Sequence, residues 1–534
     1  MSRRLWVIPS IAAAVFAAAA ASNASAPAVP ADMQNVLSRP YYANATWSLR
    51  VLDGAKVLVD VNSRKQLFIG SVRKVFTLSQ LLDAVGPNKT YDTPVYRTGA
   101  IGNGVLHGNL ILVASGDLTM GGRINPDGSI AISNWDHNEA DSLGNAILTA
   151  PNPLAGYAKL AQQVRAAGIR RVTGEVIVDD RLWTPWNFRD QFNVRPIFVN
   201  DDLVDVSITP GGSVGARAQM TTRPVSAALK VVNGLTVGAA GSKDTLKIDP
   251  QYPACIGKPG CSAAITGSLP SDFTPPLTGK PQLVQAVRIV QPSNYARTVF
   301  VEQLAAAGVK VDARTVEPNP TQLLPGKGMY LGTNQVARLT GMPERDDAKY
   351  VAKISYNIGA DSSLVLWGLT KKADSMPAAL AAERKNLAAN FGITSSQYHF
   401  VDGSGGGDTT ASGGAVVHML QAMAKRPAYP ALYDALPVLA VDGSLAFVKD
   451  FEKDPTLAGA AGHVRAKTGT FVDNNGSGGV VLKGQALAGY VTTKRGHHLT
   501  FQLVVNNVPI SGIDDIVKVF QDEGTLSAML WRDY

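Results

Sequence analysis

The sequence predicts an α+β fold in which an antiparallel sheet is flanked by helices and interrupted by inserted β-rich domains. Apolar residues alternate along residues 46–61 and again along 486–506, as in paired strands near both ends of the chain. Helical periodicity occupies residues 71–85 and much of 334–424. Between these parts, residues 95–329 contain short apolar strands separated by many glycine, proline and asparagine turns, which indicates a separate region.

The first predicted elements are a hairpin and a helix. The hairpin turns at Asp53-Gly54, and the helix begins at Ser71 and ends before Gly86-Pro87. The further expected helices are 334–341, 348–369, 376–391, 415–424 and 514–530, and the further expected strands are 105–113, 172–178, 486–492 and 499–506.

The length of the chain allows several domains. With 534 residues, 45% of them hydrophobic, the chain can bury a sizeable core and has room for roughly three domains of ordinary size. We assign residues 27–94 and 330–534 to one domain, and residues 95–329 to inserted β-rich domains, which we expect to be two in number.

The charge of the chain bears on its partners. The formal net charge is +8, and it falls by two if Arg3 and Arg4 are removed. The sequence contains no run of five basic residues and no nucleic-acid-binding motif, so no nucleic-acid partner is expected. A modest positive excess suits contact with an anionic polymer such as cell wall.

Residues 1–26 resemble a secretory signal peptide. Arg3 and Arg4 precede an apolar run over residues 5–21, and small residues follow up to Ala26. The alternative is an uncleaved membrane anchor. No other stretch approaches the roughly 20 apolar residues of a membrane span. We therefore expect an exported protein of the periplasm or another extracytoplasmic part of the cell envelope, without an integral membrane span after cleavage.

The cysteines form one close pair. Cys255 and Cys261 lie in a segment rich in proline and glycine, and an exported chain can oxidise such a pair to a local disulfide. A zinc site is the poorer alternative, because two cysteines without nearby histidines leave the ion short of ligands.

A serine and a lysine at helical spacing form the first candidate catalytic pair. In Ser71-Val72-Arg73-Lys74 the two outer residues lie on one face at the start of a helix, so the Lys74 amine can reach the Ser71 hydroxyl. Burial favours the neutral form of an amine, which can then accept the serine proton. The alternative is a helix-capping serine beside a solvated lysine.

Two further motifs follow in a characteristic order. Ser355-Tyr356-Asn357 comes more than half the chain length after Ser71, and Lys467-Thr468-Gly469-Thr470 enters a predicted strand. Each motif is weak alone. The order S-x-x-K, S-x-N, K-T-G, with the first opening a helix and the last on a strand, is typical of penicillin-binding proteins and class A β-lactamases.

The chain resembles, more narrowly, the low-molecular-mass penicillin-binding proteins that are D-alanyl-D-alanine carboxypeptidases and endopeptidases with a large insertion between the first two motifs. The resemblance covers most of residues 45–530 and includes five further stretches. These are residues 114–117, 174–180, 402–405 (Asp-Gly-Ser-Gly), 436–445 and 487–493.

The resemblance implies a penicillin-binding/β-lactamase-like catalytic domain and a serine acyl-enzyme mechanism without a metal or cofactor. The implied substrates are peptidoglycan stem peptides, and β-lactam antibiotics are implied as covalent inhibitors. For the reaction itself, the resemblance implies that Ser71 is the nucleophile, Lys74 the general base and Ser355 a proton relay. For substrate binding, it implies that Asn357 binds the acyl chain and that Lys467 and Thr468, in the same motif as Gly469, bind the carboxylate. The backbone amides of Ser71 and Thr470 are implied to form the oxyanion hole.

Two positions bear on recognition of the peptide side chain. Asp179 matches a family position proposed to meet an amino group on the substrate, and its structural alternative is a turn-capping aspartate. Family members typically have an arginine shortly after the Asp-Gly-Ser-Gly stretch, whereas Asp408 lies in the corresponding segment here. This difference predicts that a substrate with an amidated side-chain end is cleaved faster than its acidic counterpart.

Two alternative functions remain. A β-lactamase shares the nucleophile and the lysine, but no E-x-x-L-N glutamate stands in a matching place, and the long insertion disfavours it. A non-enzymatic cell-wall-binding module is disfavoured because all the reactive residues are present.

Overall fold

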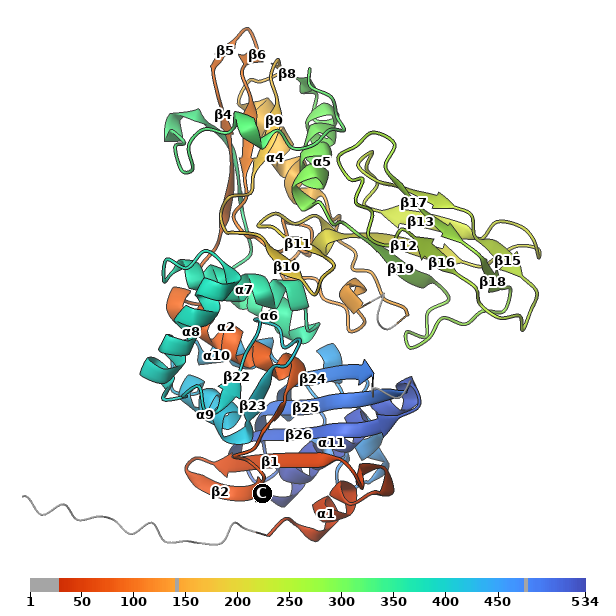
Figure 1. The fold of residues 1–534 in the computed structure, drawn as a ribbon, viewed down its shortest axis with the longest axis vertical. Coiled ribbons are helices and arrows are strands. Elements are labelled where there is room, and N and C mark those ends of the chain that lie inside the picture. Colours follow the sequence, from red (N-terminus) through yellow and green to blue (C-terminus); the bar gives the residue numbers. More distant parts are fainter. Residues whose placement is uncertain (1–27, 140–143, 475–478) are drawn as a thin grey trace, which may run out of the picture.

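The computed structural model describes residues 28–139, 144–474 and 479–534, so the predicted signal peptide lies outside the described residues. Its largest sheet is antiparallel and is built from both ends of the chain (Figure 1). The strands, in spatial order, are β2 (Lys56–Val61), β1 (Thr46–Asp53), β26 (His498–Ile510), β25 (Val480–Thr492) and β24 (Val464–Asn474). The α+β fold class is therefore as predicted.

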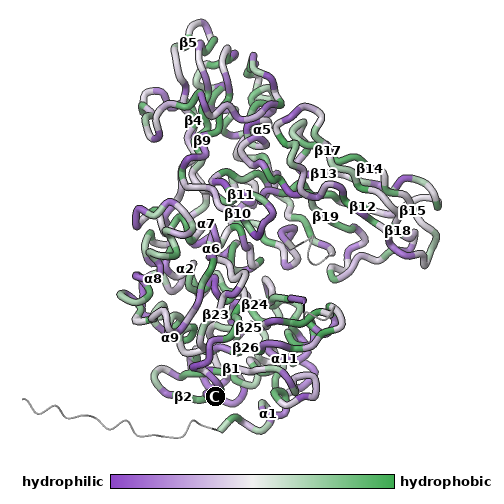
Figure 2. The backbone as a smooth tube through the Cα atoms, in the orientation of Figure 1, coloured by the Kyte–Doolittle hydropathy of each residue, from purple (hydrophilic) through white to green (hydrophobic). Residues whose placement is uncertain are grey.

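Both faces of this sheet are covered by helices. In β25, Leu487 and Val491 join the core formed with α11 (Ile513–Asp533), whereas Ala486 and Ala488 join the core on the other face. Successive side chains of a strand point to opposite faces, so a strand buried on both faces is almost continuously apolar. The hydrophobic stretches along the sheet strands are visible in Figure 2.

Most of the helices gather on the face of the sheet opposite α11 (Figure 1). The helices on that face are α2 (Arg73–Val85), α6 (Glu344–Lys353), α7 (Asn357–Leu369), α8 (Met376–Phe391), α9 (Gly413–Met423) and α10 (Tyr429–Ala435), whereas α1 (Ala31–Leu37) packs on the same side as α11. A small sheet lies beside them, formed by β22 (Tyr398–His399), β23 (Thr410–Ser412) and β3 (Gln66–Phe68).

Two helix predictions were wrong. Residues 334–341 form a strand, β21 (Gln335–Thr340), because Ala337 and Leu339 alternate with exposed neighbours and the strand pairs with β4 (Asp92–Arg97). The predicted helix 348–369 is divided into α6 and α7, because Ser355 adopts a positive φ of 59° that a helix cannot contain.

The residues between α2 and α6 form several small sheets, and none of their strands joins the five-stranded sheet in the described residues. One of these sheets contains, in spatial order, β21, β4, β7 (Leu110–Val113) and β9 (Val176–Asp179). Another contains β20 (Lys310–Val311), β8 (Arg171–Val172), β6 (Val105–His107) and β5 (Ala100–Gly102). The others combine β13 (Gln219–Arg223), β12 (Leu203–Thr209) and β19 (Leu283–Arg288); β14 (Lys230–Asn233), β17 (Ser262–Thr266) and β16 (Lys247–Asp249); β15 (Thr236–Gly238) and β18 (Ser268–Pro270); and β10 (Trp186–Phe188) and β11 (Phe192–Val194).

This inserted region, which we define as β4 to β21, also contains, among its described residues, two helices that we did not predict, α4 (Ala155–Ala166) and α5 (Pro292–Ala306). The sequence does carry a signal for α4, because Tyr157, Leu160, Ala161 and Val164 are buried at helical spacing. Cys255 and Cys261 form the expected local disulfide. None of the helices in the described ranges is long and apolar enough to cross a membrane.

Candidate active site

Ser71 and Lys74 lie within hydrogen-bonding distance at the start of α2. Ser71 belongs to a short 3-10 turn, Gly70–Val72, which leads directly into the helix. The Lys74 Nζ atom lies 2.8 Å from the Ser71 Oγ atom, as the three-residue spacing predicts. The Lys74 side chain is fully buried, whereas Ser71 is partly exposed. The pair therefore offers an accessible hydroxyl beside a dehydrated amine.

Lys74 also connects two distant parts of the chain to Ser71. Its Nζ atom lies 2.7 Å from the Asn357 Oδ1 atom and 3.0 Å from the backbone oxygen of Ser404. Asn357 is the first residue of α7, and Ser404 belongs to the Asp-Gly-Ser-Gly stretch. Three oxygen atoms around one amine fix its position next to the Ser71 hydroxyl, and a neutral amine can donate to two of them and accept from the hydroxyl.

A second lysine holds the other two motifs together. The Lys467 Nζ atom donates hydrogen bonds to the Ser355 Oγ atom at 3.0 Å and to the Thr468 backbone oxygen at 2.9 Å. Ser355 lies at the break between α6 and α7, and Lys467 lies on β24. The three sequence motifs are thus brought together in one site.

Two glycines allow the backbones of these motifs to approach closely. A Cβ atom at Gly469 would lie 2.2 Å from the Ile69 backbone oxygen and 3.0 Å from the Ser71 amide nitrogen. A Cβ atom at Gly70, whose φ is +49°, would lie 3.0 Å from the Thr470 amide nitrogen. Only residues without a side chain permit this contact. The amides of Ser71 and Thr470, the predicted oxyanion donors, consequently lie on neighbouring segments.

A buried ion pair anchors the helix that carries Ser71 and Lys74. Arg73, the residue before Lys74, contacts Glu383 of α8 at 2.6 Å, and both side chains are almost completely buried. The Arg73 guanidinium also lies 4.1 Å from the centre of the Phe400 ring. Burial raises the pKa of Glu383, and the charge of Arg73 opposes that rise. The ion pair fixes α2 against α8.

The loop that supplies the Ser404 oxygen is also fixed by carboxylates. The Asp402 side chain accepts hydrogen bonds from the amides of Ser404, Gly405 and Gly406 at 2.7–3.0 Å. The Gly403 amide donates to Asp361 at 2.9 Å. Burial, together with the nearby Asp402 carboxylate, raises the pKa of Asp361 to about 7.

Sequence reasoning missed the roles of two motifs that it did notice. Residues 402–405 provide the Ser404 oxygen beside Lys74. Residues 436–445 provide Ser444, whose Oγ atom lies 2.7 Å from the Thr468 Oγ1 atom. The similarity of these stretches to the family was the available signal, but only the structure gives them a position.

Asp179 does not join this cluster through any hydrogen bond in the described part of the chain. Its carboxylate accepts hydrogen bonds from the Arg181 side chain at 2.7 and 2.9 Å and from the Tyr330 hydroxyl at 2.5 Å. Although burial opposes the charged form, these donors lower the pKa of Asp179. Its proposed contact with a substrate amine remains a prediction.

The surroundings of Asp408 differ from the sequence-based expectation. Asp408 is highly exposed, and Lys483 contacts it at 3.2 Å. A second cation lies closer to the motif loop, because a Cβ atom at Gly406 would lie 3.1 Å from the Nε atom of Arg189, although the Asp402 carboxylate would lie nearer still, at 2.8 Å. Arg189 follows β10 in the inserted region. Two cations, Lys483 and Arg189, therefore lie near the carboxylates of Asp408 and Asp402.

Comparison with curated proteins finds relatives of one kind. Over 315 residues the chain is 27% identical to the D-alanyl-D-alanine carboxypeptidase of Actinomadura sp. (strain R39), covering 55% of this chain and about half (50%) of that enzyme. Over 498 residues it is 22% identical to D-alanyl-D-alanine carboxypeptidase DacB of Haemophilus influenzae, covering 90% of this chain and 88% of the relative.

Comparison with solved structures supports the fold. The crystal structure of penicillin-binding protein 4 (dacB) from Haemophilus influenzae matches with a TM-score of 0.67 and 18% identity, covering 94% of this chain and 99% of the other. That protein has also been crystallised in complex with a β-lactam. The model of the D-Ala-D-Ala carboxypeptidase 3 (S13) family matches residues 29–521, which include all three motifs. The chain therefore belongs to the D-Ala-D-Ala carboxypeptidase 3 (S13) family of peptidases.

Proposed function

We propose that this protein is an exported serine D-Ala-D-Ala carboxypeptidase and endopeptidase that acts on peptidoglycan stem peptides and is covalently inhibited by penicillins. The observation that carries the proposal is the contact of 2.8 Å between the Lys74 amine and the Ser71 hydroxyl, in a site that also contains Asn357 and Lys467. This is the arrangement of a nucleophile beside its base. Family membership supports the substrate class.

In the proposed acylation step, the Ser71 Oγ atom attacks the carbonyl carbon between two D-alanines and gives its proton to neutral Lys74. The amides of Ser71 and Thr470 stabilise the oxyanion. The carbon–nitrogen bond then breaks, and the leaving amine receives through Ser355 the proton that Lys74 had accepted, so that Lys74 is neutral again. Water hydrolyses the resulting ester and restores Ser71.

Substrate binding is assigned to the remaining motif residues. Lys467 and Thr468 bind the terminal carboxylate, since one supplies a positive charge and the other a hydroxyl at the edge strand β24. Asn357 binds the acyl chain from the opposite side, at the beginning of α7. The proposed steps use side chains and backbone amides of this chain and require no metal or cofactor.

The function is tested by measuring steady-state release of D-alanine from a stem pentapeptide, with nitrocefin turnover measured alongside. We expect continuous release of D-alanine and only about one equivalent of nitrocefin consumed per protein, because the acyl-enzyme formed from a β-lactam is not rapidly hydrolysed. Rapid nitrocefin turnover without D-alanine release would instead identify a β-lactamase. Absence of both reactions would favour a non-enzymatic cell-wall-binding module.

We further propose that the two cations near Gly406 oppose the preference for amidated substrates that Asp408 alone predicts. With Lys483 paired to Asp408 and Arg189 beside Gly406, we expect a stem peptide with an acidic side-chain end to be cleaved faster than its amidated form at low salt. The difference should be at most about fivefold and should shrink as salt rises, because an exposed ion pair is worth about 1 kcal/mol or less.

Initial rates on the two peptides, at two salt concentrations, measure this preference. Arg189→Gln should remove it. Arg217→Gln is the control, since it makes the same change of net charge at an exposed arginine elsewhere in the inserted region. Faster cleavage of the amidated peptide by the wild-type protein would restore the interpretation based on Asp408 alone.

A further inference from the structure

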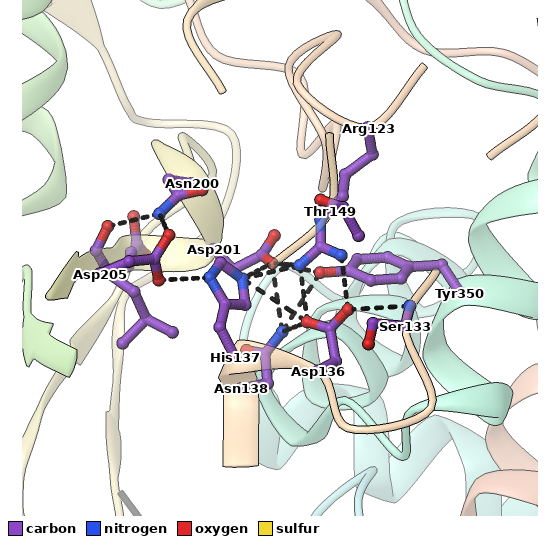
Figure 3. Close-up of polar contacts among 12 residues, drawn as sticks. Arg123, Ser133, Asp136, His137, Asn138, Thr149, Asn200, Asp201, Asp205 and Tyr350 are labelled. Carbon is purple, nitrogen blue, oxygen red and sulfur yellow. Dashed lines mark hydrogen bonds and ion pairs between the residues drawn. The ribbon is translucent and has the colours of Figure 1, made fainter. Parts of the chain in front are cut away.

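A buried network of charged residues lies where the inserted region meets the helix before Ser355 (Figure 3). Tyr350 of α6 projects into this network, and the other members come from the inserted region. The charged members are Arg123, Asp136, His137, Asp201 and Asp205, and their side chains are all at least nine-tenths buried.

Arg123 and His137 pair with the three carboxylates of the network, and Arg223 also contacts Asp205 at 3.3 Å. The Arg123 guanidinium makes two hydrogen bonds to Asp136, at 2.7 and 2.8 Å, and a further one to Asp201. The His137 ring bonds Asp201 at 2.5 Å and Asp205 at 2.6 Å. Although burial disfavours the charged ring, these carboxylates raise the pKa of His137 to about 9. The network is therefore an assembly of internal ion pairs.

The same residues are a poor metal site. Ligand atoms of Asp136, His137 and Asp201 lie within 4.8 Å of one another. The Arg123 guanidinium, however, already bridges the two carboxylates and supplies their counter-charge. A metal ion would have to displace this cation from its partners at the cost of an uncompensated buried charge.

Tyr350 is held by this network on both its hydroxyl and its ring. Its hydroxyl donates to Asp201 and accepts a hydrogen bond from the Asn138 side chain at 3.2 Å. The Arg123 guanidinium lies 4.6 Å from the centre of its ring. The side chain is completely buried, so it has little freedom to adopt another rotamer.

The ring of Tyr350 contacts the middle residue of the S-x-N motif. Its centre lies 5.3 Å from that of Tyr356, which is also buried. Tyr356 lies between Ser355 and Asn357, the two motif residues that contact Lys467 and Lys74. Ser355 itself has the strained φ of 59°. Such a conformation persists only where the surroundings determine it, and the Tyr350–Tyr356 contact is part of those surroundings.

We propose that Tyr350, held by Asp201 and Arg123, is a positioning residue through which the inserted region sets the place of Ser355 and Asn357. This inference rests on the proposed serine mechanism. The inserted region also reaches the K-T-G side of the site, because the Gly443 amide donates to Asn134 at 2.9 Å and the next residue, Ser444, contacts Thr468 at 2.7 Å. The inserted region thus contacts residues next to both the S-x-N motif and the K-T-G motif.

The test compares two substitutions of Tyr350 with the same substitutions of Tyr42. Tyr350→Phe removes the hydroxyl and keeps the ring, and Tyr350→Leu removes both. Tyr42 is a matched control, because it is a buried tyrosine whose hydroxyl donates to an aspartate, Asp522, that also pairs with an arginine. Tyr42 packs in the core on the α11 face of the sheet. Asp201 retains Arg123 and His137 when the Tyr350 hydroxyl is lost, so the Phe variant should fold.

We expect Tyr350→Phe to lower the rate constant of acylation by a fluorescent penicillin about tenfold, and Tyr350→Leu about a hundredfold, because a displacement of about 1 Å at a catalytic group has an effect of that size. The dissociation constant of the initial, non-covalent complex should change less than the acylation rate constant, since Lys467 and Thr468, which bind the carboxylate, are untouched. The melting temperature should fall by a similar amount in the Tyr350 and Tyr42 variants.

Three outcomes decide the inference. Acylation slowed in the Tyr350 series but not in the Tyr42 series, at similar melting temperatures, supports it. Wild-type acylation in Tyr350→Phe and Tyr350→Leu, or equal slowing in the Tyr42 series, overturns it. If the wild-type protein itself is not acylated, the proposed serine mechanism fails, and that result is distinct from a failure of the positioning role.

Discussion

Ser71→Ala is expected to abolish covalent labelling by a fluorescent penicillin and to reduce D-alanine release by about a millionfold, the size of effect that loss of a serine nucleophile has in other serine hydrolases. The reason is that the Ser71 Oγ atom is the group that we expect to form the ester, with Lys74 Nζ 2.8 Å away to take its proton. Removal of one oxygen atom from a partly exposed side chain should leave the fold intact.

The measurement is intact-protein mass spectrometry after exposure to penicillin, followed by peptide mapping. Ser79→Ala is the matched control, because Ser79 lies on the same helix, is fully buried, and has an Oγ atom without a hydrogen-bond partner in the described structure. It should label like the wild type. An adduct that persists in Ser71→Ala, or that maps to Ser355, would assign the nucleophile to another residue.

Lys74→Arg and Lys467→Arg should have different effects although the substitution is the same. Lys74 is expected to accept a proton, and a guanidinium cannot do so near neutral pH, so Lys74→Arg should slow acylation by at least about a thousandfold. The Lys74 Nζ atom also has three oxygen atoms at 2.7–3.0 Å, and a guanidinium would have to rearrange these contacts. Lys467 is expected to hold an anion, so Lys467→Arg should retain acylation and raise KM about tenfold.

Acylation rate constants and KM, determined for both variants beside their melting temperatures, separate these roles. Each variant serves as the control for the other, because both replace a buried lysine that contacts a motif hydroxyl. Equal loss of acylation in the two variants, at similar melting temperatures, would contradict the separate roles of proton acceptor for Lys74 and anion binder for Lys467.

The predicted elements were most accurate where a local pattern reports burial directly. Strands β25 and β26 are almost continuously apolar, and α2, α8 and α9 carry helical periodicity, so their types and approximate positions could be predicted. Residues 335–340 were wrongly predicted as a helix because their strand partner, β4, lies in a distant part of the chain. Propensity over six residues is weak compared with such pairing.

In the Ser71 site, too, a contact within one helix could be predicted, whereas contacts between distant segments could not. The spacing of Ser71 and Lys74 gives their contact from helix geometry alone, within one turn. The contact of Lys74 with Asn357, by contrast, joins residues separated by 283 positions. Similarity to a family indicated that the motifs meet, whereas their physical arrangement depends on how the helices pack against the sheet.

The sequence by itself determined the order of the three motifs, the elements that carry the first and the last of them, and the family, because these depend on residue identity and local periodicity. The tertiary structure decided that Ser355 breaks a helix at positive φ, that Arg189 lies beside Gly406, and that a buried ionic network holds Tyr350 against Tyr356. These features join segments far apart in the chain. Their free energy comes from contacts that form only after the chain has folded, so no local pattern encodes them.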